Sequence, residues 1–264
     1  MKELNQLNYA SSVTDNEEYP QTCLEASHNY RAFAVFRQNL AYTSALEHVT
    51  EAQGQACVDI IATDPQISTA LDEFRQNDSY GSPFVCEYPS VGRFSPTTLR
   101  YVKVLVDLKS YFGNLDNHRI CEIGVGYGGQ CRVINAYFKP AAYCLIDILP
   151  ALGLAQRYLD NYVLPSVMSY MTMNQLPVTE SDLVISNYAF SELRRPIQEA
   201  YLKKVILPAK RGYIIFNQIA PADFQSYTVA ELVQLIPGAR VFEERPLTHP
   251  HNCLIVWGEQ LNGA

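Results

Sequence analysis

A glycine-rich segment near the middle of the chain carries the clearest chemical signal. It reads EIGVGYGG over Glu122–Gly129 and lies between an apolar strand pattern and a helical pattern. Glycines there permit positive φ angles, and they let a ligand approach the backbone without meeting a Cβ atom. The N–H groups that open the following helix face such a ligand. The segment therefore predicts a ligand-binding loop, with contacts from Gly124, Gly126, Tyr127 and Gly128.

Glu122 separates two interpretations of this loop. The glycines also fit G-x-G-x-x-G, so an NAD-type oxidoreductase is one alternative. A carboxylate two positions before Gly124 suits the cationic amino group of a methionine-type ligand and is unfavourable beside a pyrophosphate. A dinucleotide fold also needs a second mononucleotide-binding half. The chain ends instead in a strand–turn–strand pattern over 239–258. Both features favour the methionine-type ligand.

Asp147 ends the next apolar strand pattern, AYCLIDI, and lies 147 − 122 = 25 positions after Glu122. A carboxylate at this strand end can accept hydrogen bonds from two ribose hydroxyls. The alternative is a cap for the helix that begins at Leu149-Pro150. We favour the ribose role, and we expect the neighbouring Ile148 to contact the same ligand.

The segment Asn187–Glu192 follows another apolar strand and supplies further candidates. Asn187 and Tyr188 are expected to line the methionine part of the ligand, where Tyr188 could stack or donate a hydrogen bond. Glu192 could act as a general base or bind a substrate hydroxyl. The alternative for Glu192 is a carboxylate in the first turn of the following helix, which the helix dipole favours.

Two of the five histidines, His249 and His251, fall in the turn between the last two strands. Histidine titrates near neutral pH and is the most common general base. His249 is thus a candidate base and His251 a candidate substrate contact. The alternative is an ordinary exposed hairpin shaped by Pro250.

Polar residues at the start of a helix over 96–112 form a further candidate group, expected to contact substrate. Thr97, Arg100 and Tyr101 recur at helical spacing and share one face. An arginine there could grip a carboxylate or phosphate, or it could simply close a contact within the protein. The proposed substrate contacts are Tyr80, Arg93, Ser95, Thr97 and Arg100.

These candidates need an α/β framework to bring them together. After residue 115, apolar strands alternate with helical patterns, which predicts a Rossmann-like, doubly wound, mostly parallel sheet with an antiparallel closing strand. Before that point the pattern is mainly helical. Thr22 and Glu25 predict a capping box for a helix running to about Thr50, and Asp64-Pro65 and Ser95-Pro96 predict two more helix starts. We expect a helical unit over 1–114 and an α/β domain over 115–264.

Composition narrows the function classes. The chain has 264 residues, is 48% hydrophobic and carries a net charge of −7, which is unfavourable for binding nucleic acid or an anionic membrane surface. Its start is polar and lacks the apolar core of a signal peptide, and no apolar run has the length of a membrane span. The seven cysteines contain no C-x-x-C pair, so we expect reduced, mostly buried thiols in a cytoplasmic protein with no metal site.

Four segments together resemble one enzyme family. They are SPTTLRYVKVLVDL, CEIGVGYGGQCRV, DLVISNYAFSEL and PLTHPHN. The glycine segment is similar to that of class I S-adenosylmethionine (SAM)-dependent methyltransferases in general. The other three resemble the sugar O-methyltransferase family, and the resemblance extends over about residues 75–258.

The resemblance implies SAM as cofactor, a sugar hydroxyl of a glycan or nucleotide-sugar precursor as acceptor, and S-adenosylhomocysteine as product. A sugar hydroxyl is a poor nucleophile, so a base should assist it. A small-molecule O- or N-methyltransferase and a non-catalytic SAM-binding protein are the alternatives besides the NAD-type oxidoreductase. The helical unit 1–114 would then cover the site and help select the acceptor.

Overall fold

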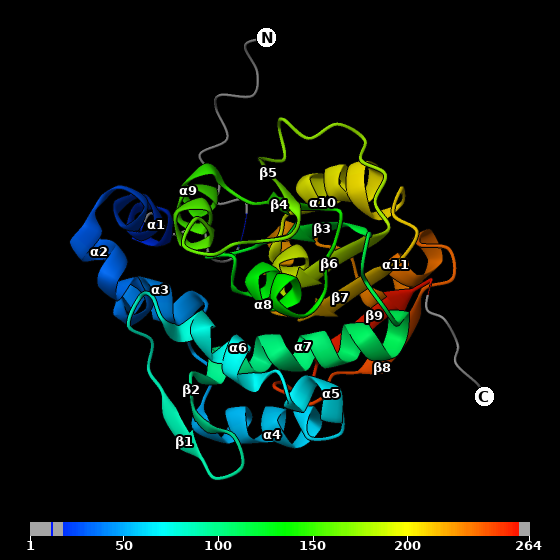
Figure 1. Cartoon of the computed structure of the whole chain (residues 1–264). Coiled ribbons are helices and arrows are strands. Elements are labelled where there is room, and N and C mark those ends of the chain that lie inside the picture. The colour runs from blue at the N-terminus through cyan, green and yellow to red at the C-terminus, as the bar shows by residue number, and fades with distance from the viewer. Residues whose placement is uncertain (1–11, 13–17, 259–264) are drawn as a thin grey trace.

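One mostly parallel sheet organises the chain, whose computed structural model describes Ser12 and residues 18–258 (Figure 1). The strands are β3 (Arg119–Ile123), β4 (Ala142–Ile146), β5 (Val167–Met171), β6 (Leu183–Asn187), β7 (Gly212–Phe216), β8 (Arg240–Glu243) and β9 (Cys253–Trp257). They lie in the order β5-β4-β3-β6-β7-β9-β8, and β9 runs antiparallel to both of its neighbours. The predicted fold class and its antiparallel closing strand are confirmed.

The sequence patterns did not predict β5. This strand is at the edge of the sheet, and its five residues are all exposed or half-buried. An edge strand with mixed polar and apolar residues lacks the continuous apolar run of a central strand, which is the feature that revealed β3, β4 and β6.

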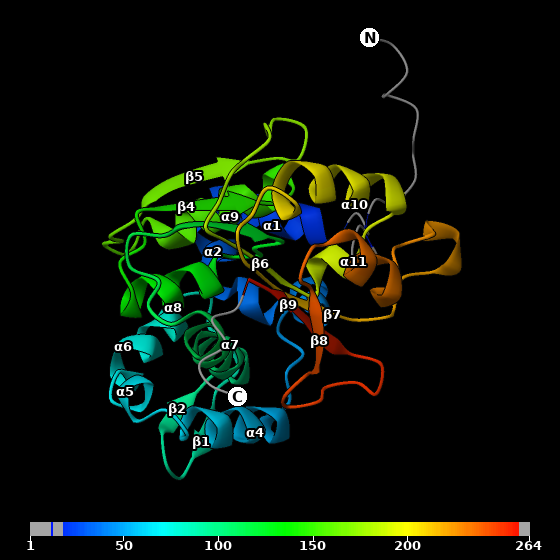
Figure 2. The same cartoon turned by 90° about the vertical axis from the view of Figure 1, so that its right-hand side faces the viewer.

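Helices cover both faces of the sheet. Alternate strand residues separate two apolar clusters, so that Ile120 faces one and Cys121 the other. The first face is covered by α7 (Pro96–Phe112), α8 (Gly129–Tyr137) and α9 (Leu149–Leu159). The second face is covered by α10 (Arg195–Tyr201), the π-turn Leu202–Ile206 and α11 (Val229–Leu235). Figure 2 shows the sheet lying between α10 on one side and α7 with α8 on the other.

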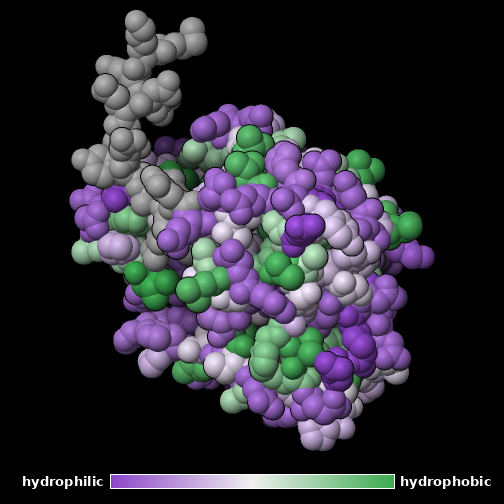
Figure 3. Space-filling model, turned by 90° about the vertical axis from the view of Figure 1, so that its left-hand side faces the viewer, coloured by the Kyte–Doolittle hydropathy of each residue, from purple (hydrophilic) through white to green (hydrophobic). Residues whose placement is uncertain are grey.

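Short elements before α7 pack around this body. They are α1 (Glu18–His28), α2 (Tyr30–Val35), α3 (Leu40–Ala45), α4 (Glu51–Ile61), α5 (Pro65–Ser68), α6 (Leu71–Arg75) and the hairpin of β1 (Cys86–Tyr88) and β2 (Gly92–Phe94). α1 packs against α9, and α4 packs against α7. On the face where α1 and α2 lie, hydrophobic residues form small separate groups among hydrophilic ones (Figure 3).

The prediction of one long helix from Thr22 to Thr50 is wrong. Thr22 lies inside α1, and the chain then breaks twice, at Asn29 and at Asn39. Each asparagine accepts backbone N–H bonds with its side-chain oxygen and so begins a new helix, which is the local competition that favours asparagine at caps. Thr50 forms a capping box with Gln53 and begins α4 instead of ending a helix.

The other predicted helix ends are confirmed. Asp64 accepts the N–H groups of Gln66 and Ile67 and begins α5. α7 begins at Pro96 after Ser95, and Gly113 ends it with a φ of 74°. All seven cysteines lie in the described residues and are free, and six of them are buried, as expected.

The polar segment 1–17, which the sequence predicts not to be a signal peptide, lies outside the described residues except for Ser12. Across the described residues, each helix is either too short or too polar to cross a membrane.

Candidate functional site

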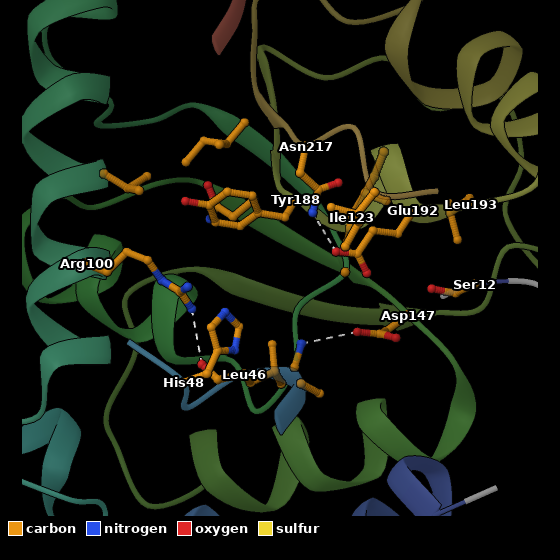
Figure 4. Close-up of a pocket in the computed structure, with 18 of the residues that line it drawn as sticks. Ser12, Leu46, His48, Arg100, Ile123, Asp147, Tyr188, Glu192, Leu193 and Asn217 are labelled. Atoms are coloured by element: carbon orange, nitrogen blue, oxygen red, sulfur yellow. Dashed lines mark hydrogen bonds between the residues drawn. The ribbon is translucent and has the colours of Figure 1, made fainter. Parts of the chain in front are cut away.

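A pocket of about 860 Å³ opens at the carboxyl ends of the parallel strands. It is lined by Ile123 at the end of β3, Asp147 after β4, Asn187 at the end of β6 and Asn217 after β7. The strand order reverses between β3 and β6, and crevices at such reversal points are the usual ligand sites of open α/β sheets. Figure 4 shows that side chains from the sheet, from α7 and from the N-terminal segments point into the same space.

The glycine loop forms one wall of the pocket. Gly124 and Gly126 line it, with φ angles of 75° and 54° that disfavour other residues. A Cβ atom on Gly124 would lie 2.0 Å from the Cβ of Ala189, and one on Gly126 would lie 2.8 Å from Leu46. These glycines are therefore required by backbone conformation and by neighbouring side chains.

Asp147 ties this loop to β4. Its Oδ2 atom accepts the N–H groups of Val125 at 2.8 Å and Gly126 at 3.2 Å, and Oδ1 accepts the N–H of Ile148 at 2.7 Å. The carboxylate makes no cap bond to α9, whose first residue is Leu149. Asp147 thus lines the pocket beside Ile148 while it holds the loop, and the loop N–H groups of Val125 and Gly126 are already donated within the protein.

Glu122 lies beneath the loop, outside the pocket lining. Its side chain is on the face of β3 that packs toward α8, with the residue only 2% exposed, and the Tyr143 hydroxyl donates to it at 2.6 Å. Burial, opposed in part by the Tyr143 hydrogen bond, raises its pKa to about 8. Successive residues of β3 point to opposite faces of the sheet, so Glu122 points away from the pocket while Ile123 and Gly124 line it. Contact of Glu122 with a ligand therefore stays a prediction from the sequence.

The rest of the predicted loop lies behind the wall. Tyr127 is fully buried and receives a hydrogen bond from Asn77, and Gly128 packs against Leu159. Neither residue lines the pocket, and the start of α8 is covered by Tyr101 and Tyr127. The part of the loop that faces the pocket is the part before Tyr127.

Asn187 and Tyr188 both line the pocket, as expected of ligand contacts. The amide nitrogen of Asn187 donates to Gln130 at 3.4 Å, and its Oδ1 atom is buried without a hydrogen-bond partner among the described residues. Tyr188 has a φ of 68°, a conformation that costs a bulky residue free energy. Such strain collects at functional sites.

Glu192 points into the pocket from a 3₁₀ turn, Ala189–Glu192, that precedes α10. It is not in the first turn of that helix. The Asn217 amide donates to its Oε1 atom at 2.7 Å, and burial raises the pKa of the Glu192 carboxyl above its usual value. A carboxylate that is desolvated but held by one donor has the properties of a general base.

His249 lies at the rim of the pocket and is exposed. His251 is exposed as well, does not line the pocket, and has its ring centroid 5.5 Å from that of His249. The turn therefore brings one of the two predicted histidines to the site.

Glu244 is a buried site residue that the sequence analysis missed. It is 2% exposed, lines the pocket and accepts the Tyr188 hydroxyl. It also accepts the Thr248 N–H at 3.0 Å, the Thr248 hydroxyl at 2.8 Å and the Asn252 amide at 3.1 Å. One carboxylate therefore fixes both the turn that carries His249 and the ring of Tyr188.

The part of α7 that faces the pocket lies about one helical turn further toward the C-terminus than expected. Arg100, Lys103 and Val104 line the pocket, at the spacing of one helix face. Thr97 and Tyr101, which were expected to share the site with Arg100, are buried in the protein. Tyr101 packs against Tyr127, with ring centroids 6.0 Å apart.

Three other predicted substrate contacts lie away from the pocket. Ser95 is fully buried and receives a hydrogen bond from Arg37 at 3.2 Å. Arg93 is exposed on β2. Tyr80 packs edge-on against Tyr158, with ring centroids 6.3 Å apart, and lines a separate surface groove.

The N-terminal segments form the far wall of the pocket, which the sequence analysis did not resolve. Tyr19, Leu46 and His48 line it, and the segment that carries the last two is anchored by a buried arginine. Arg37 pairs with Glu47 at 2.6 Å and with Asp78 at 3.1 Å. Sequence patterns could not reveal this wall, because it depends on pairs up to 41 positions apart.

Within the described residues, no three His, Cys, Asp or Glu side chains are grouped so that they could hold a metal ion.

No protein-family model matches the sequence, and no curated protein matches it significantly. The resemblance to sugar O-methyltransferases therefore has no support from a family model.

Solved structures that resemble the chain include several methyltransferases. The pyocyanin biosynthetic protein PhzM is 15% identical over 62% of this chain and 58% of its own, with a TM-score of 0.44. The methyltransferase domain of bacterial CtHen1 is 14% identical over 60% and 96%, with a TM-score of 0.44. An O-methyltransferase family protein from Burkholderia thailandensis is 13% identical over 62% and 57%, with a TM-score of 0.44. Identities and TM-scores this low assign neither a family nor an activity.

Proposed function

We propose that the protein is a SAM-dependent methyltransferase that holds the ribose of its cofactor at Asp147. The observation that carries the proposal is the position of this carboxylate, which lines the pocket at the end of β4 next to Gly124 and Gly126. A carboxylate at such a strand end can accept hydrogen bonds from two ribose hydroxyls. Ile148 and Met173 line the adjoining part of the pocket, where an adenine ring would find apolar contacts.

Asn187 is proposed to receive the amino group of the cofactor. Its buried Oδ1 atom lacks a partner among the described residues, and a buried acceptor gains free energy when a charged N–H donor reaches it. Together, Asp147 after β4 and Asn187 at the end of β6 give acceptors for two different donors of one ligand, on the two strands that flank β3.

The NAD-type alternative fits this pocket less well. A pyrophosphate at a glycine-rich loop is held by backbone N–H groups. Here those of Val125 and Gly126 bind Asp147, whose charge would repel a phosphate. The closing strand β9 is antiparallel, so the second half of the sheet departs from the all-parallel pattern of a dinucleotide fold.

The proposed reaction is transfer of a methyl group to a sugar hydroxyl. When bound, SAM supplies a methyl group on a positively charged sulfur, which leaves as a neutral sulfide. Glu192 would accept the proton that the acceptor hydroxyl loses when it is methylated. The polar lining by Asn217 and Asn252 supports an acceptor rich in hydroxyl groups. His249 at the rim is the second candidate base.

The helical unit 1–114 is proposed to cover this site and to help select the acceptor. Tyr19, Leu46, His48 and Arg100 of this unit line the same pocket as Asp147. Sugar specificity would then depend on residues that do not belong to the α/β domain.

Incubation with methyl-labelled SAM and a panel of sugars, sugar acids and nucleotide sugars tests the reaction. We expect label in at least one hydroxylated acceptor, with S-adenosylhomocysteine formed in equal amount. Label only in amines would favour an N-methyltransferase. Binding of SAM without transfer to any acceptor would favour the non-catalytic alternative.

A further inference from the structure

Arg100 brings a positive charge into the pocket. We propose that its guanidinium binds a carboxylate or phosphate group of a ligand in this pocket, and this inference rests on the function proposed above. Figure 4 shows the side chain reaching from α7 into the pocket beside the ring of His48.

The hydrogen bonds of Arg100 leave most of its donors available. Within the described part of the chain, its guanidinium donates one hydrogen bond, from Nη2 to the carbonyl oxygen of Leu46 at 3.2 Å, and forms no ion pair. A guanidinium has five N–H donors in a planar fork, which matches the two oxygens of a carboxylate or phosphate.

Neighbouring cations show what a paired side chain looks like in this protein. Lys103 lines the same pocket one turn later, and its ammonium group is bound to Asp107 at 2.8 Å. Arg37 is also buried, and two carboxylates accept from it. Arg100 instead has the rings of Tyr101 and Tyr188 near its Cζ atom, at 5.8 and 5.6 Å, which support the charge without using its in-plane donors.

His48 lies close enough to sense this charge. Burial and then the charge of Arg100 lower the pKa of the His48 imidazole. An anion bound to Arg100 would offset that charge, so the pKa of His48 should rise when the site fills. The histidine is therefore an internal reporter for occupancy of the site.

Two ligands of the proposed reaction could bring the same chemistry. One is the cofactor, through the carboxylate of its methionine part. The other is the acceptor, through a carboxylate or phosphate on the sugar. Both give a planar or tetrahedral oxyanion for the guanidinium, and binding measurements separate them.

Isothermal titration on the full chain tests the proposal with three probes. S-adenosylhomocysteine carries the amino-acid carboxylate, 5′-methylthioadenosine lacks it, and inorganic phosphate added to the protein saturated with 5′-methylthioadenosine tests the site alone. The variants are Arg100→Met and Arg100→Gln, and Arg93→Met is the matched control, because Arg93 is exposed and outside the pocket. Arg100→Gln keeps a donor for Leu46, so it guards against loss of fold.

We expect both Arg100 variants to weaken at least one anion about 10- to 100-fold, the usual effect of a charge-assisted bond, and Arg93→Met to weaken none. A loss for S-adenosylhomocysteine but not for 5′-methylthioadenosine identifies the cofactor carboxylate as the source. Unchanged affinity for both nucleosides with a loss for phosphate identifies the acceptor. In either case NMR titration should show the pKa of His48 rising with the anion in the wild type.

The proposal is overturned if the Arg100 variants bind S-adenosylhomocysteine and phosphate as the wild type does, or if neither probe moves the pKa of His48. Failure of both nucleosides to bind the wild type would instead contradict the proposed function. Phosphate added to the free protein would still test Arg100 in that case.

Discussion

The two halves of the pocket are built in different ways. The wall around Asp147 comes from one continuous stretch, in which β3, the glycine loop, α8 and β4 follow each other. The opposite wall combines His48, Arg100 and Glu244, which belong to three distant parts of the chain. The first wall depends on local turns and strand register, and the second depends on long-range pairs such as Arg37 with Asp78.

The largest expected effect is at Glu192, which belongs to neither of the two walls. Glu192→Gln should lower kcat about 10²- to 10⁴-fold, the usual contribution of a general base, while the affinity for S-adenosylhomocysteine stays within a factor of about two. His249→Ala is the matched variant and should cost much less, because His249 is exposed at the rim. Steady-state rates with an acceptor from the panel decide the matter, and the opposite ranking would make His249 the base.

Asp147→Ala tests the first wall, the local wall, which comes from one continuous stretch of the chain. It removes the proposed ribose acceptor and the partner of the Val125 and Gly126 N–H groups, so S-adenosylhomocysteine should bind about 100-fold more weakly in titration calorimetry. Asp147→Asn retains an acceptor oxygen for the loop and separates the two effects. If both variants kept wild-type affinity and a wild-type melting temperature, the ribose assignment would be wrong.

Glu244→Ala tests the opposite wall, the assembled wall, which combines His48, Arg100 and Glu244 from three distant parts of the chain. It leaves the donors of Tyr188, Thr248 and Asn252 without their shared acceptor, which should lower the free energy of unfolding by about 2 kcal/mol. Acceptor affinity should fall more than affinity for S-adenosylhomocysteine, because none of these bonds reaches the glycine loop. Urea denaturation and titration calorimetry measure the two quantities. Equal losses for cofactor and acceptor would show that the walls are not independent.

Glu122→Gln should change stability, and its effect depends on pH. The folded protein raises the pKa of this carboxyl from 4.5 to about 8, so folding keeps a proton that the unfolded chain loses. Its contribution to stability therefore falls as the pH rises from about 4.5 to about 8 and is constant above that range. Glutamine cannot ionise, so the variant should melt at the wild-type temperature near pH 4.5 and a few degrees higher at pH 8.5. The exposed Glu87→Gln serves as control, and a pH-independent difference would contradict the assignment.

The sequence predicted the local wall well and the assembled wall poorly. Gly124, Gly126, Asp147, Asn187 and Tyr188 all lie in the pocket, because strand ends and glycine turns follow from patterns a few residues long. The orientation of Glu122 toward Tyr143 was not predictable, since it depends on which face of β3 meets α8.

Glu244 follows β8, and the sequence around it has no pattern that marks a pocket residue. His48 was assigned to the predicted helix that runs to about Thr50, whereas α3 ends at Ala45. Both positions are set by tertiary contacts, through the turn around Thr248 and through the anchor of Glu47 on Arg37. The pocket-facing residues of α7 lie one helical turn later than predicted for the same reason. Packing against α4 and α8 decides which residues of this helix face the pocket.

The central claim is that the pocket at Asp147 binds SAM, and titration calorimetry with S-adenosylhomocysteine beside NAD⁺ tests it most directly. We expect saturable binding of S-adenosylhomocysteine at one site per chain and no heat of binding from NAD⁺. Binding of NAD⁺ with none of S-adenosylhomocysteine would contradict the account and would make the protein an NAD-type oxidoreductase.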